Sequence, residues 1–443
     1  MTGGHDAGGA MGGVVTGGVS TGGATTSGTG AGGATGGVPT GGVATGGATG
    51  GATGGVPTGG SATGGVPMGG SATGGGPMGG SATGGGPTGG SATGGYATGG
   101  VATGGAAPAP TDFDNPIIKY DAADPTNGPG EYIYTADPAV MVYEGRVYLY
   151  TGHDEQVVGG TDYSMYDYRL WSSVDMVNWQ NHGSVLRYSD IPWARSSTGT
   201  GNAYAAHVTH REDTSGASKF YFYMTLEGGN EPNWGFSIGV AVGESPEGPF
   251  VDPRGMPMIL LTDTQAYASH TWRNIDPVVF VDDDGQAYLY WGNGNLYWVE
   301  LEDDMIHLKG EGYTTGGDGT MRNRDFSSVE LHVVDVPDYE EAPYLSKHGD
   351  LYYLVYASGF PERIAYATST SPRGPWEYRG EIMGQMPGTG TIHPALFDFN
   401  GASYLAYHNA ALPNGGDYRR SACVDRAYFN GDGTIRPVIQ TSR

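Results

Sequence analysis

Five stretches of the sequence repeat one pattern of hydrophobic and polar positions. Each opens on a polar or small residue, usually followed by Pro, and continues as an apolar strand, a tight turn and an aromatic-rich strand. The openings are Asp137, Ala205, Asp276, Ala342 and His393, which lie 68, 71, 66 and 51 residues apart. Repetition at such intervals is typical of a modular array whose units cannot bury their apolar faces alone.

Turn-forming residues separate the first two strands of most repeats, as at Glu144–Gly145 and Asn400–Gly401. A second pair of strands follows in each repeat, for example over residues 169–179, 295–308 and 363–378. Four strands per repeat are typical of propeller blades. The pattern therefore predicts an all-β fold, a five-bladed β-propeller over residues 111–443.

Residues 1–110 have a different composition, almost wholly Gly, Thr, Ala, Ser, Val and Pro, with no Lys or Arg. So few apolar side chains cannot offset an ordering cost of roughly 1 to 2 kcal/mol per residue. Paired glycines break any three-residue period, which excludes a collagen helix. We expect a long disordered Gly/Thr/Ala-rich segment that acts as a linker or stalk.

The chain is strongly acidic, with 46 Asp and Glu against 21 Lys and Arg. Only Asp6 lies in residues 1–110, so residues 111–443 carry 45 acidic and 21 basic residues, a net charge of −24. Such a surface argues against nucleic acid and favours a neutral partner such as an oligo- or polysaccharide. The sequence does not indicate an oligomeric state.

Cys423 is the only cysteine, so no disulfide can form within the chain. No apolar run approaches the roughly 18 residues that span a bilayer, and the first residues show no secretory signal. We nevertheless expect an extracellular or cell-surface location, because a long Gly/Thr stalk is more useful outside a cell.

The acids Asp137, Asp276 and Glu341 occupy corresponding positions in the first, third and fourth repeats. Equivalent positions of a radial array converge on its axis, so these carboxyl groups should share one small space. An Asp-Pro pair is also a common strand opening, which explains each acid alone structurally. Three acids at equivalent positions favour a functional interpretation, because buried unpaired carboxylates are costly.

Paired carboxyl groups cleave glycosidic bonds, one protonating the leaving oxygen and the other activating water or attacking the sugar. Glu341 as proton donor needs a pKa raised by about 2 units, and a negative Asp276 beside it would contribute. Asp137 is then the general base on a water molecule. A separation of about 6.5 to 9.5 Å across the axis would predict inversion at the anomeric carbon.

The repeat openings resemble those of glycoside hydrolase family 43, five-bladed propeller glycosidases that act mainly on arabinose- and xylose-containing polysaccharides. The similar segments are TADPAVMVYEGRVYLYTGHDE, NIDPVVFVDDDGQAYLYWGNG, YEEAPYLSKHGDLYYLVYASG and TIHPALFDFNGASYLAYHNAALPNGGDYRRS. The resemblance implies that Asp137 is the general base, Asp276 the pKa modulator and orienter, and Glu341, rather than Glu340, the general acid. The TGHDE and RRS segments look most like the α-L-arabinofuranosidase and β-xylosidase branch.

The resemblance also implies an axial position for His393 and a place for Arg420, or its neighbour Arg419, near the sugar hydroxyls. We predict His393 and Arg420 as substrate-binding residues. Some relatives hold a structural calcium or sodium ion through water at the axis, although a lone His is more often part of the hydrogen-bonded scaffold. Catalysis itself should need no cofactor, and the sequence offers no zinc-ligand spacing.

These features lead to the hypothesis of an inverting glycoside hydrolase that releases terminal arabinofuranose from plant cell-wall polysaccharides. The alternatives within the enzyme class are a β-xylosidase, a bifunctional enzyme and an endo-arabinanase. A catalytically silent carbohydrate-binding propeller is the alternative outside it.

Overall fold

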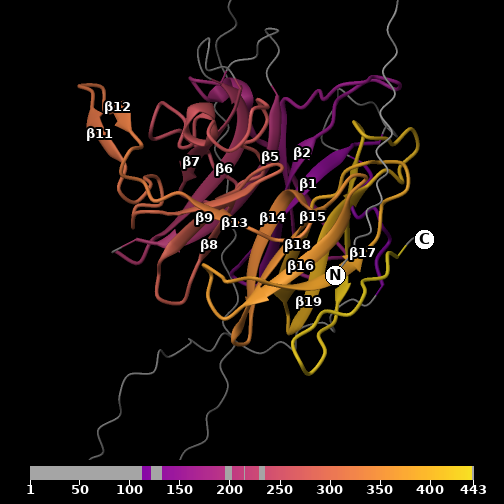
Figure 1. Cartoon of the computed structure of the whole chain (residues 1–443). Coiled ribbons are helices and arrows are strands. Elements are labelled where there is room, and N and C mark those ends of the chain that lie inside the picture. The colour runs from indigo at the N-terminus through magenta and orange to yellow at the C-terminus, as the bar shows by residue number, and fades with distance from the viewer. Residues whose placement is uncertain (1–111, 121–131, 195–201, 214, 229–234, 442–443) are drawn as a thin grey trace, which may run out of the picture. The chain divides into compact units, whose positions relative to one another are not determined.

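Five antiparallel sheets of three or four strands, one from each sequence repeat, form most of the part of the chain that the structure describes (Figure 1). The computed structural model describes residues 112–120, 132–194, 202–213, 215–228 and 235–441. All of them belong to one unit, Tyr96–Arg443. The predicted disordered segment, residues 1–110, lies outside the described residues.

Each blade runs from an inner strand at the axis to an outer strand. Blade one consists of β1 (Thr135–Tyr143), β2 (Arg146–His153), β3 (Asp167–Ser173) and β4 (Gln180–Arg187). Blade two consists of β5 (Ala203–Glu212), β6 (Ser218–Gly228) and β7 (Gly235–Gly243). Blade three consists of β8 (Val278–Val281), β9 (Ala287–Trp291), β10 (Leu296–Glu300) and β13 (His332–Val334). Blade four consists of β14 (Tyr339–His348), β15 (Leu351–Ser358), β16 (Arg363–Ser369) and β17 (Glu377–Met383). Blade five consists of β18 (Ala395–Phe399), β19 (Ala402–Asn409) and β20 (Ser421–Ala427).

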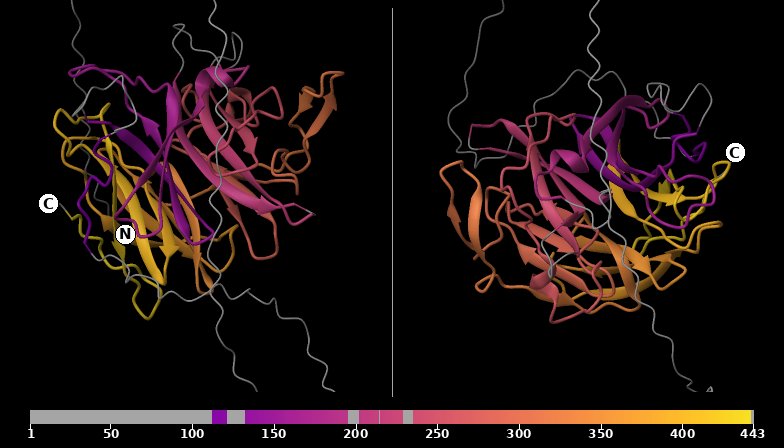
Figure 2. Two further views of the ribbon diagram at one scale, coloured as in Figure 1. Left: turned by 180° about the vertical axis from the view of Figure 1, so that it is seen from behind. Right: turned by 90° about the horizontal axis from the view of Figure 1, so that it is seen from above.

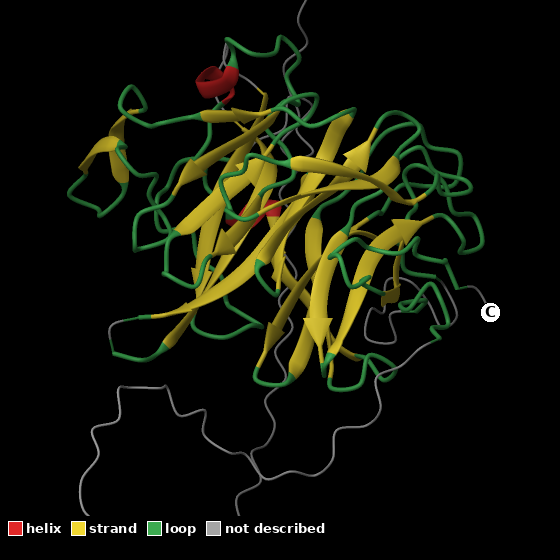
Figure 3. Ribbon diagram, turned by 60° about the horizontal axis from the view of Figure 1, so that its bottom comes forward, coloured by secondary structure: helices red, strands yellow, loops and turns green. Residues whose placement is uncertain are grey.

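The inner strands close into a ring. The strands β1, β5, β8, β14 and β18 contact one another in this order, and β18 contacts β1 again. Seen from above, the sheets follow one another around the axis in chain order (Figure 2). The predicted five-bladed β-propeller is therefore confirmed, and the described helices are two short 3₁₀ turns, at Tyr188–Asp190 and Leu261–Thr264 (Figure 3).

Two of the predicted turns join strands as tight hairpins. Glu144 and Gly145 have φ values of 47° and 73°, and Asn400 and Gly401 have 48° and 73°. Positive φ at both central residues is the geometry of a type I′ turn, whose twist matches that of the flanking strands. The hairpins place the second strand of each blade between two neighbours, and β19 is buried along its whole length.

The N-terminal end of the described chain completes blade five. The Ile117 amide donates to the Ala422 carbonyl of β20 over 2.9 Å. The Asn115 side chain both donates to the Val424 carbonyl and accepts from the Val424 amide, each over 2.9 Å. Since the segment Asn115–Ile117 lies against the last strand of the chain, the ring is closed by its two ends, and the edge of β20 is not left open.

Blade three departs from the sequence prediction. The segment 295–308 was expected to supply both outer strands, but after β10 the chain turns back, and Leu308 forms only an isolated bridge with Leu301. The outer strand is β13, which arrives after a protruding hairpin of β11 (Gly312–Thr315) and β12 (Met321–Asp325) (Figure 1).

A buried charge network holds the base of this hairpin. The Arg254 guanidinium pairs with both Glu311 oxygens over 2.8 and 3.0 Å, and Arg324 pairs with Glu311 over 2.6 Å. Arg324 also contacts Asp263 over 2.9 Å. The network joins the hairpin to the loop that precedes blade three.

Cys423 is buried and free. Among the described residues, no helix has the length and apolar character needed to cross a bilayer.

Candidate active site

One cavity of about 480 Å³ collects acidic and aromatic side chains from several blades. Its lining includes Asp137, Asp276, Glu341 and Arg420, four of the five residues predicted from sequence. The other described lining residues are Asp162, Tyr163, Tyr204, Ala205, Glu227, Phe236, Trp272, Ile275, Asn293, Glu340, Phe360, Glu362 and Thr391. His393, the fifth predicted residue, is not among the described residues that line it.

The backbone is bent where the acids project. Asp137, Asp276 and Ala342, the residue after Glu341, have φ values of 51°, 58° and 50°. The strand register shifts at the same places in β1 and β14, so each strand carries a bulge there. A Pro follows each of these residues, and because Pro has no N–H the irregular ladder loses no donor. Such left-handed backbone costs free energy outside glycine and tends to occur at functional sites.

Asp137 is buried and carries a counter-ion. Arg420 Nη1 donates to Asp137 Oδ1 over 2.8 Å, and His408 Nδ1 lies 3.3 Å from the same oxygen. Burial alone would raise the pKa of Asp137, but Arg420 and His408 more than offset it and hold the pKa well below its usual range. Asp137 is therefore a carboxylate at neutral pH.

Arg420 is itself held in place. Its Nε and Nη2 donate to the two oxygens of Asp154 over 3.0 Å each. Its Cζ lies 5.0 Å from the centre of the Tyr163 ring. The guanidinium thus orients Asp137 with most of its hydrogen-bonding capacity already used. Whether it also contacts substrate stays a prediction.

Glu341 and Asp276 form the second part of the site. Asn293 Nδ2 donates to Glu341 Oε2 over 2.8 Å, and the Ala342 amide donates to Asp276 Oδ2 over 3.0 Å. Burial raises the pKa of Glu341 to about 7, with Asn293 opposing the shift and the charge of Asp137 adding to it. Burial and the neighbouring Glu341 also raise the pKa of Asp276, so the negative charge expected of Asp276 is disfavoured, and Asp137 supplies the charge that acts on Glu341. A carboxylate and a carboxyl group that is still partly protonated near neutral pH therefore line one cavity.

Comparison with known protein families agrees with this geometry. The model of the glycosyl hydrolases family 43 matches residues 131–435. The chain belongs to this family. It is a glycosidase, which decides against the silent carbohydrate-binding propeller.

Relatives of this family 43 enzyme carry xylosidase and arabinosidase names. It is 30% identical to a xylosidase/arabinosidase of Bacteroides ovatus over 338 residues, covering 69% of this chain and 95% of the relative. It is 32% identical to an arabinoxylan arabinofuranohydrolase of Bacillus subtilis, covering 68% and 62% of the two chains. Among solved structures, an α-L-arabinofuranosidase of Clostridium thermocellum is similar with a TM-score of 0.54 and 32% identity, covering 69% and 94%.

His393 lies behind Asp137 in this family 43 enzyme. It is buried, and its Nδ1 is 3.9 Å from Asp137 Oδ1. Burial lowers the pKa of His393 to about 4, so its imidazole is neutral. Its predicted contact with substrate stays a prediction, because the contact described is with the carboxylate.

The axis offers few ligands for calcium, which takes six to eight oxygens. Near His393 the described side chains include His207 and Asp137, and Asp137 Oδ1 already pairs with Arg420. An ion at this place would have to keep most of its water ligands.

One other cluster of the glycosidase has the geometry of metal ligands. The ligand atoms of His153, Glu155 and Asp167 lie within 4.8 Å of one another. His153 Nδ1 is 2.9 Å from Asp167 and 3.2 Å from Glu155. Burial would lower the pKa of His153, but the two carboxylates raise it to about 9. An imidazolium between two carboxylates explains the cluster without a metal ion.

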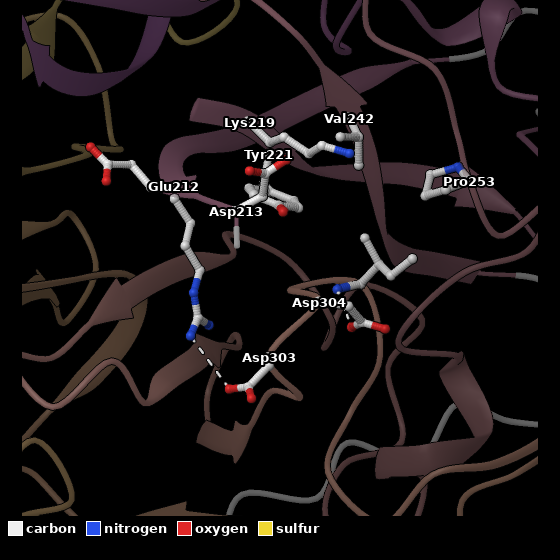
Figure 4. A pocket seen from close by; sticks show the side chains of 10 residues that line it. Glu212, Asp213, Lys219, Tyr221, Val242, Pro253, Asp303 and Asp304 are labelled. Atoms are coloured by element: carbon white, nitrogen blue, oxygen red, sulfur yellow. Dashed lines mark hydrogen bonds and ion pairs between the residues drawn. The ribbon is translucent and has the colours of Figure 1, made fainter. Parts of the chain in front are cut away.

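A second cavity of about 510 Å³ lies at the other end of blade two (Figure 4). Its lining includes Arg211, Glu212 and Asp213, at the C-terminal end of β5. Tyr204 and Ala205, at the N-terminal end of the same strand, line the acid cavity. A ten-residue strand is about 33 Å long, so the two cavities are far apart. Asp213 accepts amides of its own turn, and Arg211 pairs with Asp303. Glu212, Asp213, Asp303 and Asp304 are the carboxyl residues among its described lining, and Asp213 and Asp303 are already engaged by these local contacts.

Sequence reasoning missed several residues that support the acids. Asp154, Asn293 and His408 each contact a predicted site residue. A signal existed for one pair, because Asp154 lies in TGHDE and Arg420 in RRS, the two segments that mark the arabinofuranosidase and xylosidase branch. Asn293 and His408 carried no such signal.

Proposed function

We propose that this glycosidase is an inverting α-L-arabinofuranosidase that removes terminal arabinofuranose from plant cell-wall polysaccharides. The observation that carries the proposal is the pair of carboxyl groups whose pKa values are shifted in opposite directions in one cavity, with Asp137 ionised and Glu341 still partly protonated near neutral pH. Two relatives named arabinoxylan arabinofuranohydrolases support the choice of sugar.

In the proposed reaction, Glu341 protonates the glycosidic oxygen as its bond to the anomeric carbon breaks. Asp137 takes a proton from a water molecule, whose oxygen forms the new bond to that carbon from the opposite face. Asp276 accepts the Ala342 amide and so fixes the backbone that carries Glu341. The reaction needs no cofactor, because the two carboxyl groups supply both proton transfers.

The second candidate is a β-xylosidase or a bifunctional enzyme. Relatives named xylosidase/arabinosidase and beta-xylosidase favour it. An endo-arabinanase from Bacillus subtilis is also similar, at 27% identity. These candidates differ in the sugar that fills the cavity and in whether the polymer continues beyond it.

The experiment that tests the function compares release of the aryl group from an aryl α-L-arabinofuranoside and an aryl β-xyloside. Arabinan, arabinoxylan and xylan are the polymeric substrates, and Asp137→Ala is the inactive control. We expect faster turnover of the arabinofuranoside, and proton NMR of the first product should show the inverted anomer. No turnover above the control on any substrate would refute the glycosidase role of this site, and the retained anomer would remove Asp137 as general base.

We further propose an extracellular or cell-surface location, supported by the Gly/Thr-rich segment 1–110 and by a polymeric substrate. Fractionation of the native host should place the protein outside the cytoplasm. Recovery with cytoplasmic markers alone would contradict this.

An axial calcium ion, held largely through water beside His393, is a separate proposal. Treatment with a calcium chelator should lower the thermal unfolding midpoint, and added calcium should restore it. An unchanged midpoint would exclude a stabilising ion.

A further inference from the structure

A fourth carboxyl group, itself buried, lines the acid cavity and has no role in the proposed reaction. Glu362 lies between β15 and β16, is 3% exposed, and shares the cavity with Asp137, Asp276 and Glu341. The other cavity-lining carboxyl groups of the described chain outside the reaction, Asp162, Glu227 and Glu340, are more exposed.

The contacts of Glu362 fix one of its oxygens. Glu362 Oε2 accepts the Ile392 amide over 2.5 Å, and the Glu362 amide donates to the Gly390 carbonyl over 2.9 Å. These bonds join the loop of blade four to the segment that leads into blade five. The structure gives Oε1 no hydrogen-bond partner among the described residues, and this oxygen is the one available to a ligand.

No cation balances Glu362 within the described chain. Arg363, the next residue, pairs with Glu381 over 2.9 Å, and the Arg420 guanidinium is bound to Asp137 and Asp154. The groups that act on Glu362 electrostatically are the acids Glu341, Asp276 and Glu340. A buried carboxylate among acids, with one amide donor, would be costly, so the neutral acid is the stable form. Accordingly, burial raises the pKa of Glu362, and Glu341 and Asp276 raise it further.

We propose that Glu362 is a specificity-determining residue whose neutral carboxyl group donates a hydrogen bond from Oε1 to a hydroxyl of the bound sugar. The inference rests on the proposed function, since it takes the sugar of the reaction as its ligand. A neutral donor suits this cavity, because an ionised carboxylate could only accept and would repel the negative charge of Asp137. A site that hydrogen-bonds a hydroxyl discriminates strongly against sugars that lack it.

A purely structural role would need only the acceptor Oε2, which holds residues 390–392. Within this segment, Thr391 Oγ1 lies 3.2 Å from Nε2 of His408, the residue that also contacts Asp137, so a displaced segment could change activity without any contact between Glu362 and the sugar. The test must therefore detect the sugar hydroxyl itself.

The first experiment measures binding rather than turnover, so that it is independent of the proposed reaction. Dissociation constants of L-arabinose, D-xylose and their monodeoxy analogues are determined by NMR titration for the parent, Glu362→Leu and Glu362→Gln. In the parent, loss of one particular hydroxyl should weaken binding about tenfold, and in Glu362→Leu the same loss should cost no more than about twofold. Glu362→Gln, which keeps a donor and an acceptor, should recover most of the affinity that Leu loses.

Glu381→Leu, at a carboxylate outside the cavity, is the matched control and should show the parent's full dependence on that hydroxyl. Equal penalties in the parent and Glu362→Leu for every deoxy sugar would overturn the proposal, as would the absence of binding of either sugar to the parent. A failed aryl glycoside assay with an intact binding pattern would refute only the proposed function.

The second experiment needs no sugar and no Leu variant, which can be unstable. The infrared difference between the parent and Glu362→Gln at neutral pH should show loss of the carbonyl stretch of a protonated carboxyl group. Glu381→Gln should instead show loss of carboxylate stretches, because Glu381 pairs with Arg363. Carboxylate loss in Glu362→Gln would overturn the proposal.

Discussion

At the residue scale, Asp137 has the most strongly fixed charge of the site. Its carboxylate meets Arg420 and His408, so replacement by the isosteric amide removes the base and keeps the volume. We expect Asp137→Asn to lower kcat on an aryl arabinofuranoside by about 100- to 10,000-fold, the usual contribution of general base catalysis, with a small change in KM. Steady-state kinetics measure this, with Asp213→Asn in the remote cavity as the control. A loss of less than tenfold would contradict the role of base.

Asn293 is expected to set the upper limit of the pH range of kcat/KM, because it lowers the pKa of the proposed acid Glu341. Glu341 must be protonated to act, and its pKa of about 7 predicts that kcat/KM falls as the pH rises through this value. The Asn293 donor favours the ionised form and lowers this pKa, so Asn293→Leu should raise it and move the alkaline limb to higher pH. The pH profile of kcat/KM checks the direction. An unchanged or lower alkaline limb would show that Asn293 does not tune the acid.

The sequence predicted the three acids because the repeat fixes their equivalent positions. It could not predict which side chains contact the acids, since these contacts join distant segments. Arg420 and Asp154 are 266 residues apart, and His408 and Asp137 are 271 apart. Only the closed ring brings such residues together.

At the scale of elements, the segment Asn115–Ile117 is hydrogen-bonded to β20 along the outer edge of blade five, and we call this contact the seam. Asn115→Ala would leave the Val424 amide and carbonyl without their side-chain partners in a buried place. We expect a loss of about 2 to 4 kcal/mol in the free energy of unfolding, measured with urea. Asn430→Ala, at an exposed turn, is the control and should cost about 1 kcal/mol or less. Equal effects of the two substitutions would argue against a stabilising seam.

Strand pairs joined by short turns were predicted well, because turn residues and alternating apolar positions are local signals. The outer strands were harder. The outer strand β13 follows its partner β10 only after the β11–β12 hairpin, and the partner of β20 comes from the other end of the described chain. Pairing over such distances leaves no local pattern in the sequence.

At the scale of the whole molecule, every residue assigned to the cavity lies between Asp137 and Arg420. A chain that begins at Thr111 should therefore keep kcat/KM on a soluble aryl glycoside within about twofold of the full chain. The kinetics of the two chains, beside their thermal unfolding midpoints, test this. A folded truncated chain with much lower activity would show that residues 1–110 contribute to the site.

The seam also sets how the enzyme responds to tension. A pull transmitted through the N-terminal segment reaches Asn115 and Ile117 first, and they are hydrogen-bonded to β20. Arg420, the counter-ion of Asp137, is the residue immediately before β20. Tension would therefore detach residues 115–117 first and expose the outer edge of β20, while β20 stays paired with β19 and the inner strands of the blades remain folded.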